Sequence, residues 1–269
     1  MNKHEDTAAH CGVSKFVRKS NQTNICGAML EIQASMNDYE NNGLPRWKRA
    51  LDVAAILMAL PILLPLSVLI AVAIRATSQG PFLFQQERVG FRGQRFMCLK
   101  FRTMYCGAET VTHQGHLKNL MDSDAPMVKM DATGDARIIP VGKLLRSSGL
   151  DELPQLINVL KGEMSLVGPR PCLPYEAEKY LPWQLQRFNA APGLTGLWQV
   201  SGKNRTTFTR MMQLDIEYTQ TKSLWLDLKI ILKTVPALLV QMSDMRQKKK
   251  SRPSLVTPEA PMSVRATNH

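Results

Sequence analysis

Residues 53–74 read VAAILMALPILLPLSVLIAVAI, a run of 22 residues without a charged side chain. A straight helix of this length would reach about 33 Å, enough to cross the hydrocarbon core of a bilayer. Two prolines, Pro61 and Pro65, lie inside the run. Each removes a backbone hydrogen-bond donor and clashes with the preceding turn. The stretch therefore predicts a membrane-embedded helix that is broken part way along.

Basic residues lie on both sides of this run. Arg46, Lys48 and Arg49 precede it, and Arg75 follows it. Lys and Arg are enriched in the cytoplasmic flanks of membrane helices, so two basic flanks predict that both ends stay on the cytoplasmic face. The helix would then be re-entrant, entering one leaflet and returning, with an ordinary single-pass helix as the alternative.

The charge distribution favours a membrane surface over nucleic acid. The chain holds 34 Lys and Arg against 22 Asp and Glu, a net charge of +12, and the excess is uneven. Residues 45–102 carry nine basic and two acidic side chains, and residues 245–269 carry six and one. Basic residues beside an apolar anchor are typical of membrane-surface proteins, whereas a nucleic-acid binder spreads them along one binding face. Membrane lipids are therefore expected partners, and nucleic acid is not.

The rest of the chain predicts a mainly α protein with one small β-hairpin. Residues Phe82–Gln86 and Arg95–Phe101 are β-prone and flank a turn containing Gly90 and Gly93. Helices are expected at 141–146 and at 150–160, where Gly162 is a stop signal. Two amphipathic helices follow within 208–240, and Trp225 and Lys229 place the second at a membrane interface unless its apolar stripe is simply core.

These patterns divide the chain into four parts. We expect a disordered extension at 1–44, a re-entrant membrane helix at 45–76, a cytosolic domain at 77–240 and a basic disordered tail at 241–269. The five cysteines are odd in number and show no CxxC spacing. This argues against a disulfide framework or a structural zinc site, and for a reducing compartment.

Residues 150–156, LDELPQL, contain the most suggestive polar pair. Asp151 and Glu152 suit the first turn of a helix, where acidic residues interact well with the helix dipole and Ser148 would serve as N-cap. A second interpretation comes from the basic surroundings. An ionised carboxylate can attack phosphorus, and Mg²⁺ is typically held by one or two carboxylates plus substrate phosphates. The surrounding basic residues are Lys100, Arg102, Arg137, Lys143, Arg146 and Arg170.

Several co-linear segments resemble one family. They are KRALDVAAILMALPILLPLSVLIAVAIRATSQGPFLFQQERVGFRGQRFMCLKFRTM, DARIIPVGKLLRSSGLDELPQLINVLKGEMSLVGPRP, PGLTGLWQVSGKN and DIEYTQTKSLWLDLKIILKTV, within about residues 46–237. In this order they resemble the bacterial sugar transferases, the small monotopic phosphoglycosyl transferases that act as undecaprenyl-phosphate sugar phosphotransferases in exopolysaccharide synthesis. Co-linear motifs are far more specific than any one of them.

The resemblance implies a reaction and a set of site residues. A UDP-sugar would donate its phosphosugar to undecaprenyl phosphate with Mg²⁺ as cofactor, at the cytoplasmic face of the bacterial inner membrane. Downstream glycosyltransferases are possible partners. Asp151 would be the nucleophile that carries a covalent phosphosugar, paired with Glu152, and both carboxylates would serve the metal. Pro65 matches the proline that breaks the re-entrant helix. The residues implied to face the substrate are Lys100, Arg102, Arg137, Arg146, Pro169, Arg170 and Pro171.

One rival interpretation belongs to another class. A non-catalytic, basic, membrane-attached adaptor would use the hairpin and the tail to hold anionic lipids or a partner. It would leave Asp151 and Glu152 as ordinary residues at the start of a helix, and it predicts neither UMP release nor Mg²⁺ dependence.

Overall fold

The computed structural model describes residues 44–105, 137–202 and 205–250, and also positions 115, 119–121, 123 and 126–127. The expected disordered extension, except its last residue, and residues 251–269 of the expected tail lie outside these ranges. The helices are α2 (Arg46–Thr77), α4 (Gly142–Ser148), α5 (Gln155–Lys161), α6 (Pro174–Ala177), α7 (Leu197–Val200), α8 (Phe208–Thr221) and α9 (Leu224–Lys250). The strands are β1 (Leu83–Val89), β2 (Arg95–Phe101), β3 (Ser165–Val167) and β4 (Gly193–Thr195), and the 3₁₀ segments are η1 (Phe91–Gly93), η3 (Leu150–Glu152) and η4 (Pro182–Asn189).

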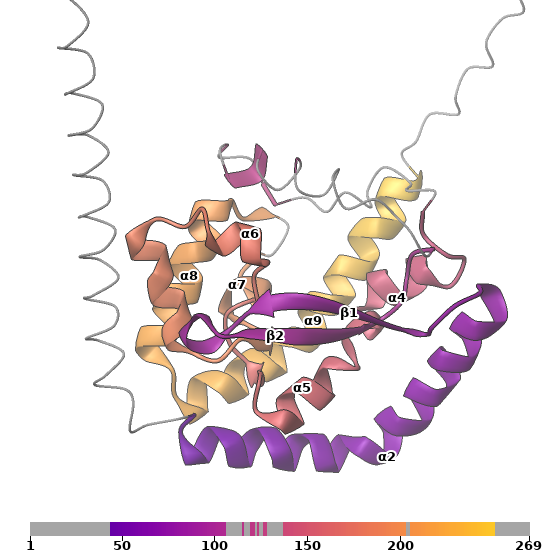
Figure 1. Ribbon diagram of the computed structural model, residues 1–269, viewed down its shortest axis with the longest axis horizontal. Coiled ribbons are helices and arrows are strands. Elements are labelled where there is room, and N and C mark those ends of the chain that lie inside the picture. Colours follow the sequence, from indigo (N-terminus) through magenta and orange to yellow (C-terminus); the bar gives the residue numbers. More distant parts are fainter. Residues whose placement is uncertain are drawn as a thin grey trace, which may run out of the picture.

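Helix α2 contains both prolines and is visibly bent near its middle (Figure 1). Pro65 has no N–H for the carbonyl of Pro61, which loosens the helix at this turn. The hydroxyl of Ser67 donates to the carbonyl of Leu63 at 2.7 Å, so it supports the turn beside the break. Within the described residues, α2 alone has the length and apolar composition to cross a membrane. Most of it is uncovered by protein: Met58 is 76% exposed and Ile62 is 72% exposed.

The first turns of α2 are fastened to the rest of the protein by polar side chains. Lys48 is buried and forms an ion pair with Asp227 of α9 at 2.5 Å. Arg49 donates to the carbonyls of Val159 and Leu160 at the end of α5. Asp52 accepts the backbone N–H of Leu166 at 3.0 Å. Two of the basic residues in the N-terminal flank therefore anchor the helix instead of lying on lipid headgroups.

The predicted β-hairpin is confirmed. Strands β1 and β2 pair antiparallel, with Leu83 opposite Phe101, Phe84 opposite Lys100 and Val89 opposite Arg95. Both turn glycines lie in the connection, and Gly93 has a φ of 72°, which suits a residue without a Cβ. Ile70 and Ile74 of α2 pack with Phe101 of β2 in one buried cluster, so this end of the hairpin lies against the second half of α2.

A second, two-stranded sheet was not predicted. Strands β3 and β4 pair in parallel, with Ser165 opposite Gly193 and Val167 opposite Thr195. Beside this sheet the two backbone segments approach closely. A Cβ on Gly168, just after β3, would overlap the carbonyl of Ala191, just before β4. Glycine is required there because no side chain fits between the chains.

Helices α8 and α9 confirm that two helices follow in this region. The buried face of α8 includes Met211 and Met212, which pack in the main hydrophobic cluster. On α9, however, Trp225 is 78% exposed and Leu232 is 76% exposed, so these members of the apolar stripe are not core. Helix α9 also continues to Lys250, past the boundary at 240 that the sequence suggested.

Candidate active site

The acidic pair lies in a 3₁₀ turn between two helices. Helix α4 ends at Ser148, and Gly149 follows with a φ of 74°, a left-handed conformation that favours glycine. Residues Leu150–Glu152 then form η3, and the N–H of Glu152 donates to the carbonyl of Gly149 at 3.1 Å. The pair is thereby presented at a sharp junction in the chain.

The α-helix expected from Leu150 begins later, at Gln155. Pro154 has no N–H for the carbonyl of Leu150, so an α-helical turn cannot close across the acidic pair. The N–H of Leu153 instead reaches the carbonyl of Leu150 at 3.3 Å, closing the tighter 3₁₀ turn. Ser148 is not an N-cap, because its hydroxyl donates back to the carbonyl of Leu144 at 2.8 Å. The stop at Gly162 is confirmed, with a φ of 85°.

Glu152 is joined to the hairpin by an ion pair. The Nζ atom of Lys100, on β2, lies 2.8 Å from Oε1 of Glu152. The side chains are 24% and 36% exposed respectively, so solvent and a ligand can reach both. This contact places the acidic turn beside the hairpin, as the basic surroundings in the sequence suggested.

Other charged groups gather around the buried thiol of Cys98. Burial raises the pKa of this thiol. The positive charges of Lys100, Arg88 and Arg170 lower the pKa, and the negative charge of Glu152 raises it. All four groups are therefore close enough to act on one sulfur atom. They come from β1, β2, η3 and the segment after β3, so the fold brings together residues that are distant in the sequence.

The Pro169–Arg170–Pro171 segment is held by three hydrogen bonds, one to each carbonyl. The backbone N–H of Gly193 donates to Pro169 at 2.8 Å. Nη2 of Arg187 donates to Arg170 at 2.7 Å, and Nη1 of Arg88 donates to Pro171 at 3.1 Å. Since proline also fixes φ on both sides of Arg170, the backbone here has very little freedom.

Both arginines that hold the segment are buried. Arg187 forms an ion pair with Asp215 of α8 at 2.6 Å and donates to the hydroxyl of Tyr180 at 2.6 Å. Burial lowers the pKa of the Arg88 guanidinium, and the neighbouring charge of Arg170 lowers it further. Within the described part of the chain, the guanidinium of Arg170 makes no hydrogen bond or ion pair. Two positive groups therefore lie close together, an arrangement that an anion would stabilise.

Arg187 was missed by sequence reasoning. A single arginine in a short irregular helix gives no signal of burial, and its partner Asp215 lies in a separate helix. Arg88 lies at the end of β1, and nothing in the strand pattern predicted that its side chain is buried.

The other basic residues predicted to face the substrate have different hydrogen-bond partners. Arg102 is buried, and its guanidinium donates to the carbonyls of Ser78 and Gln79, at the end of α2. Nη1 of Arg146 donates to the hydroxyl of Thr103 at 3.3 Å. The carbonyl of Arg137 accepts the N–H of Tyr105 at 2.9 Å, which places this residue beside the end of the hairpin. The structure thus pairs Lys100 with Glu152 and has Arg170 within electrostatic range of the same Cys98 thiol, whereas Arg102 holds the loop after α2.

The described residues contain no cluster of three or more His, Cys, Asp or Glu side chains that would enclose a metal. The adjacent carboxylates of Asp151 and Glu152 still fit Mg²⁺, which usually takes one or two protein carboxylates and completes its shell with water and substrate phosphates. A metal at this position would therefore depend on the substrate for its remaining ligands.

Comparison with known proteins gives one consistent result. Residues 44–241 match the family described as bacterial sugar transferase. The UDP-glucose:undecaprenyl-phosphate glucose-1-phosphate transferase of Caulobacter vibrioides is 44% identical over 200 residues, 71% of this chain and 69% of that protein. The exopolysaccharide production protein ExoY of Rhizobium meliloti is 39% identical, over 71% of this chain and 84% of that protein. The undecaprenyl-phosphate galactose phosphotransferase of Salmonella typhimurium is 38% identical, over 78% of this chain and 44% of that protein.

Proposed function

Because the chain belongs to the bacterial sugar transferase family, we propose that it transfers a sugar phosphate from a UDP-sugar to undecaprenyl phosphate, as the first step of exopolysaccharide or related glycan synthesis. The observation that carries the proposal is the acidic turn of Asp151 and Glu152 beside Lys100, with Arg170 close by. Relatives named as phosphotransferases support an enzyme and argue against the non-catalytic adaptor.

In the first step, a carboxylate oxygen of Asp151 attacks the phosphorus that carries the sugar. A P–O bond forms to Asp151, and the bond from this phosphorus to the bridging oxygen breaks. UMP leaves with the bonding electron pair, and the sugar phosphate remains as an acyl phosphate on the protein. Carboxylates at the start of a helical turn and near cations stay ionised at neutral pH, as this step requires.

In the second step, a phosphate oxygen of undecaprenyl phosphate attacks the same phosphorus. A new P–O–P bond forms, the acyl phosphate bond breaks, and the carboxylate of Asp151 is regenerated. The product is a polyprenyl diphosphate-linked sugar. Lys100, whose Nζ lies 2.8 Å from Glu152, would neutralise charge that gathers on the transferred phosphate.

Arg170 is the group best suited to hold the donor diphosphate. Its backbone is held by hydrogen bonds from Arg88, Arg187 and Gly193 to the Pro169–Pro171 segment, so only the side chain has to be ordered when it binds. An anion beside Arg88 and Arg170 also relieves the repulsion between them. Mg²⁺, held by Asp151 and Glu152 together with the diphosphate, would neutralise charge on the leaving group when bound.

We further propose that α2 is re-entrant and that the catalytic part lies on the cytoplasmic face, with α9 at the membrane interface. The bend at the prolines and the exposed apolar surface of α2 support this arrangement. Cysteines introduced at Leu44 and at Thr77 should both react with a membrane-impermeant reagent from the cytoplasmic side. Labelling from opposite sides would make α2 a single-pass helix.

UMP release with a panel of UDP-sugars tests the reaction itself. With UDP-glucose, UDP-galactose and N-acetylated UDP-sugars, one donor should give sustained UMP release that requires both undecaprenyl phosphate and Mg²⁺. Without the lipid acceptor, release should stop after about one turnover, because the acyl phosphate remains on Asp151. No release from any donor, or release that ignores the acceptor, would contradict the proposed function. The preferred sugar follows from the same panel.

A further inference from the structure

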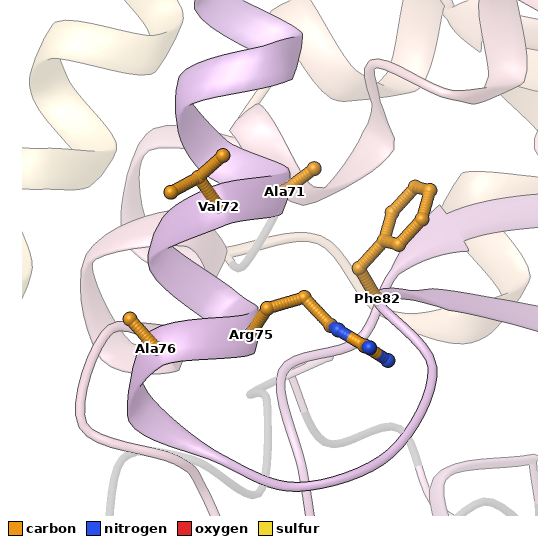
Figure 2. Close-up of a pocket in the computed structure, with 5 residues that line it drawn as sticks. All are labelled: Ala71, Val72, Arg75, Ala76 and Phe82. Atoms are coloured by element: carbon orange, nitrogen blue, oxygen red, sulfur yellow. The ribbon is translucent and has the colours of Figure 1, made fainter.

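A hollow of about 680 Å³ lies between the second half of α2 and the start of β1 (Figure 2). It is lined by Ala71, Val72, Arg75, Ala76 and Phe82. Figure 2 shows the ring of Phe82 across from Ala71, with Arg75 extending from the helix toward the strand side. The lining is apolar apart from one guanidinium, and it opens beside the helix that we place in the membrane.

Most of the hydrogen-bond donors of the Arg75 guanidinium remain available to a ligand. Its Nη1 donates to the carbonyl of Gly80 at 3.1 Å, and no described carboxylate pairs with it. The residue is exposed. A guanidinium in this position can still bind an anion, and the planar group suits a phosphate. The hollow therefore combines one anion-binding group with a surface for hydrocarbon.

The hairpin residues connect the hollow to the acidic turn. The N–H of Arg102 donates to the carbonyl of Phe82 at 2.9 Å, and Phe84 lies opposite Lys100. Because residues two apart on a strand share a face, and directly paired residues share it too, Phe82, Phe84 and Lys100 lie on one face of the hairpin. Phe82 is 38% exposed and Phe84 is 45% exposed. Lys100 then contacts Glu152.

We propose that this surface is the entry site for the isoprenoid phosphate acceptor, an inference that rests on the proposed function. Arg75 receives the phosphate at the membrane side, and the exposed rings of Phe82 and Phe84 accompany the first isoprene units. The phosphate then reaches Lys100 and the acidic turn while the rest of the chain remains against α2. An ordinary membrane phospholipid also has a phosphate and hydrocarbon chains, but it is not a substrate for transfer at the acidic turn.

Two pairs of variants test the proposal in the full-length protein in nanodiscs. Arg75→Gln removes the guanidinium, and Arg46→Gln makes the same charge change at the other, exposed end of α2. Val72→Trp fills the hollow, and Val68→Trp places the same bulk on an equally exposed valine that does not line it. Arg75→Gln should raise the KM for undecaprenyl phosphate about tenfold, as expected for one lost charged contact. Val72→Trp should raise it by about the same factor, because the indole occupies the space that the isoprenoid would need. The two control variants should change it less than about twofold.

The first half-reaction separates the possible causes. The amount of sugar phosphate on the protein without acceptor, and the KM for the donor, should be the same in the Arg75→Gln variant as in the wild type. If Arg75→Gln and Arg46→Gln raise the acceptor KM equally, the effect is one of surface charge on bulk lipid and the proposal is wrong. It is also wrong if Val72→Trp behaves like Val68→Trp. A wild-type protein that transfers no phosphosugar would overturn the proposed function and this inference with it.

Discussion

The ion pair between Lys48 and Asp227 gives a sharp prediction about how α2 is held. The two side chains are 1% and 0% exposed, and their Nζ and Oδ2 atoms are 2.5 Å apart. Nζ of Lys48 also lies 2.9 Å from the hydroxyl of Tyr218, which donates to Oδ1 of Asp227 at 2.7 Å. Burial and the charge of Asp227 raise the pKa of Tyr218, so this hydroxyl stays a neutral donor. The cluster joins the start of α2 to α8 and α9.

Lys48→Met should strongly destabilise the protein. It leaves the Asp227 carboxylate buried without its cation, and breaking a buried pair in this way costs about 3–5 kcal/mol. For a domain of this size, that corresponds to a fall in Tm of roughly 6–20 °C. Thermal unfolding in a mild detergent, followed by tryptophan fluorescence, to which the buried Trp198 contributes, measures the change.

Two further variants make the result decisive. Lys48→Met combined with Asp227→Leu removes both charges, and should return the unfolding free energy to within about 1–2 kcal/mol of the wild type. Arg95→Met breaks the exposed pair with Glu87 and should cost about 1 kcal/mol or less. If Lys48→Met costs no more than Arg95→Met, or if the double variant is as unstable as the single one, the reasoning about the buried pair is wrong.

Three further predictions concern the site. Arg187→Lys and Arg170→Gln should each reduce kcat/KM for the donor. Because Arg187 acts through Arg170, the double variant should lose far less than the product of the two single fold-losses in kcat/KM, and a loss equal to that product would refute this. Gly168→Ala should reduce activity at least about tenfold and lower Tm, because its Cβ would overlap the facing backbone; wild-type activity and Tm would show that the two chains can separate. Burial raises the pKa of Cys98 and Cys172, so at pH 8, in a variant whose other cysteines are serine, both thiols should react with iodoacetamide about tenfold or more slowly than after unfolding; equal rates would contradict their burial.

Local patterns predicted the elements that depend on neighbouring residues. The hairpin follows from two β-prone runs around Gly90 and Gly93, and α5 ends just before Gly162, as that stop signal indicated. The acidic turn was predicted in the right place but as an α-helix, because the effect of Pro154 on the turn before it was underestimated.

Features that depend on distant contacts were not predictable from one sequence. The pairing of β3 with β4 involves three residues in each strand, too short for a periodic signal. The burial of Arg187 depends on Asp215 and on the carbonyl of Arg170, which come from different parts of the chain. For the same reason, the sequence named the basic residues of the motifs but could not say what each one contacts. Arg102, for example, holds the loop after α2.

The central claim is the covalent role of Asp151, and intact-protein mass spectrometry tests it most directly. With the preferred UDP-sugar and Mg²⁺ but no lipid acceptor, the wild type should gain the mass of one sugar phosphate, located on Asp151 by peptide mapping. Adding undecaprenyl phosphate should remove it. Asp151→Asn should show no such mass gain and should lose about 10⁴-fold or more in turnover. An Asp151→Asn variant that still acquires the sugar phosphate, or a wild type that turns over without ever carrying it, would contradict the account.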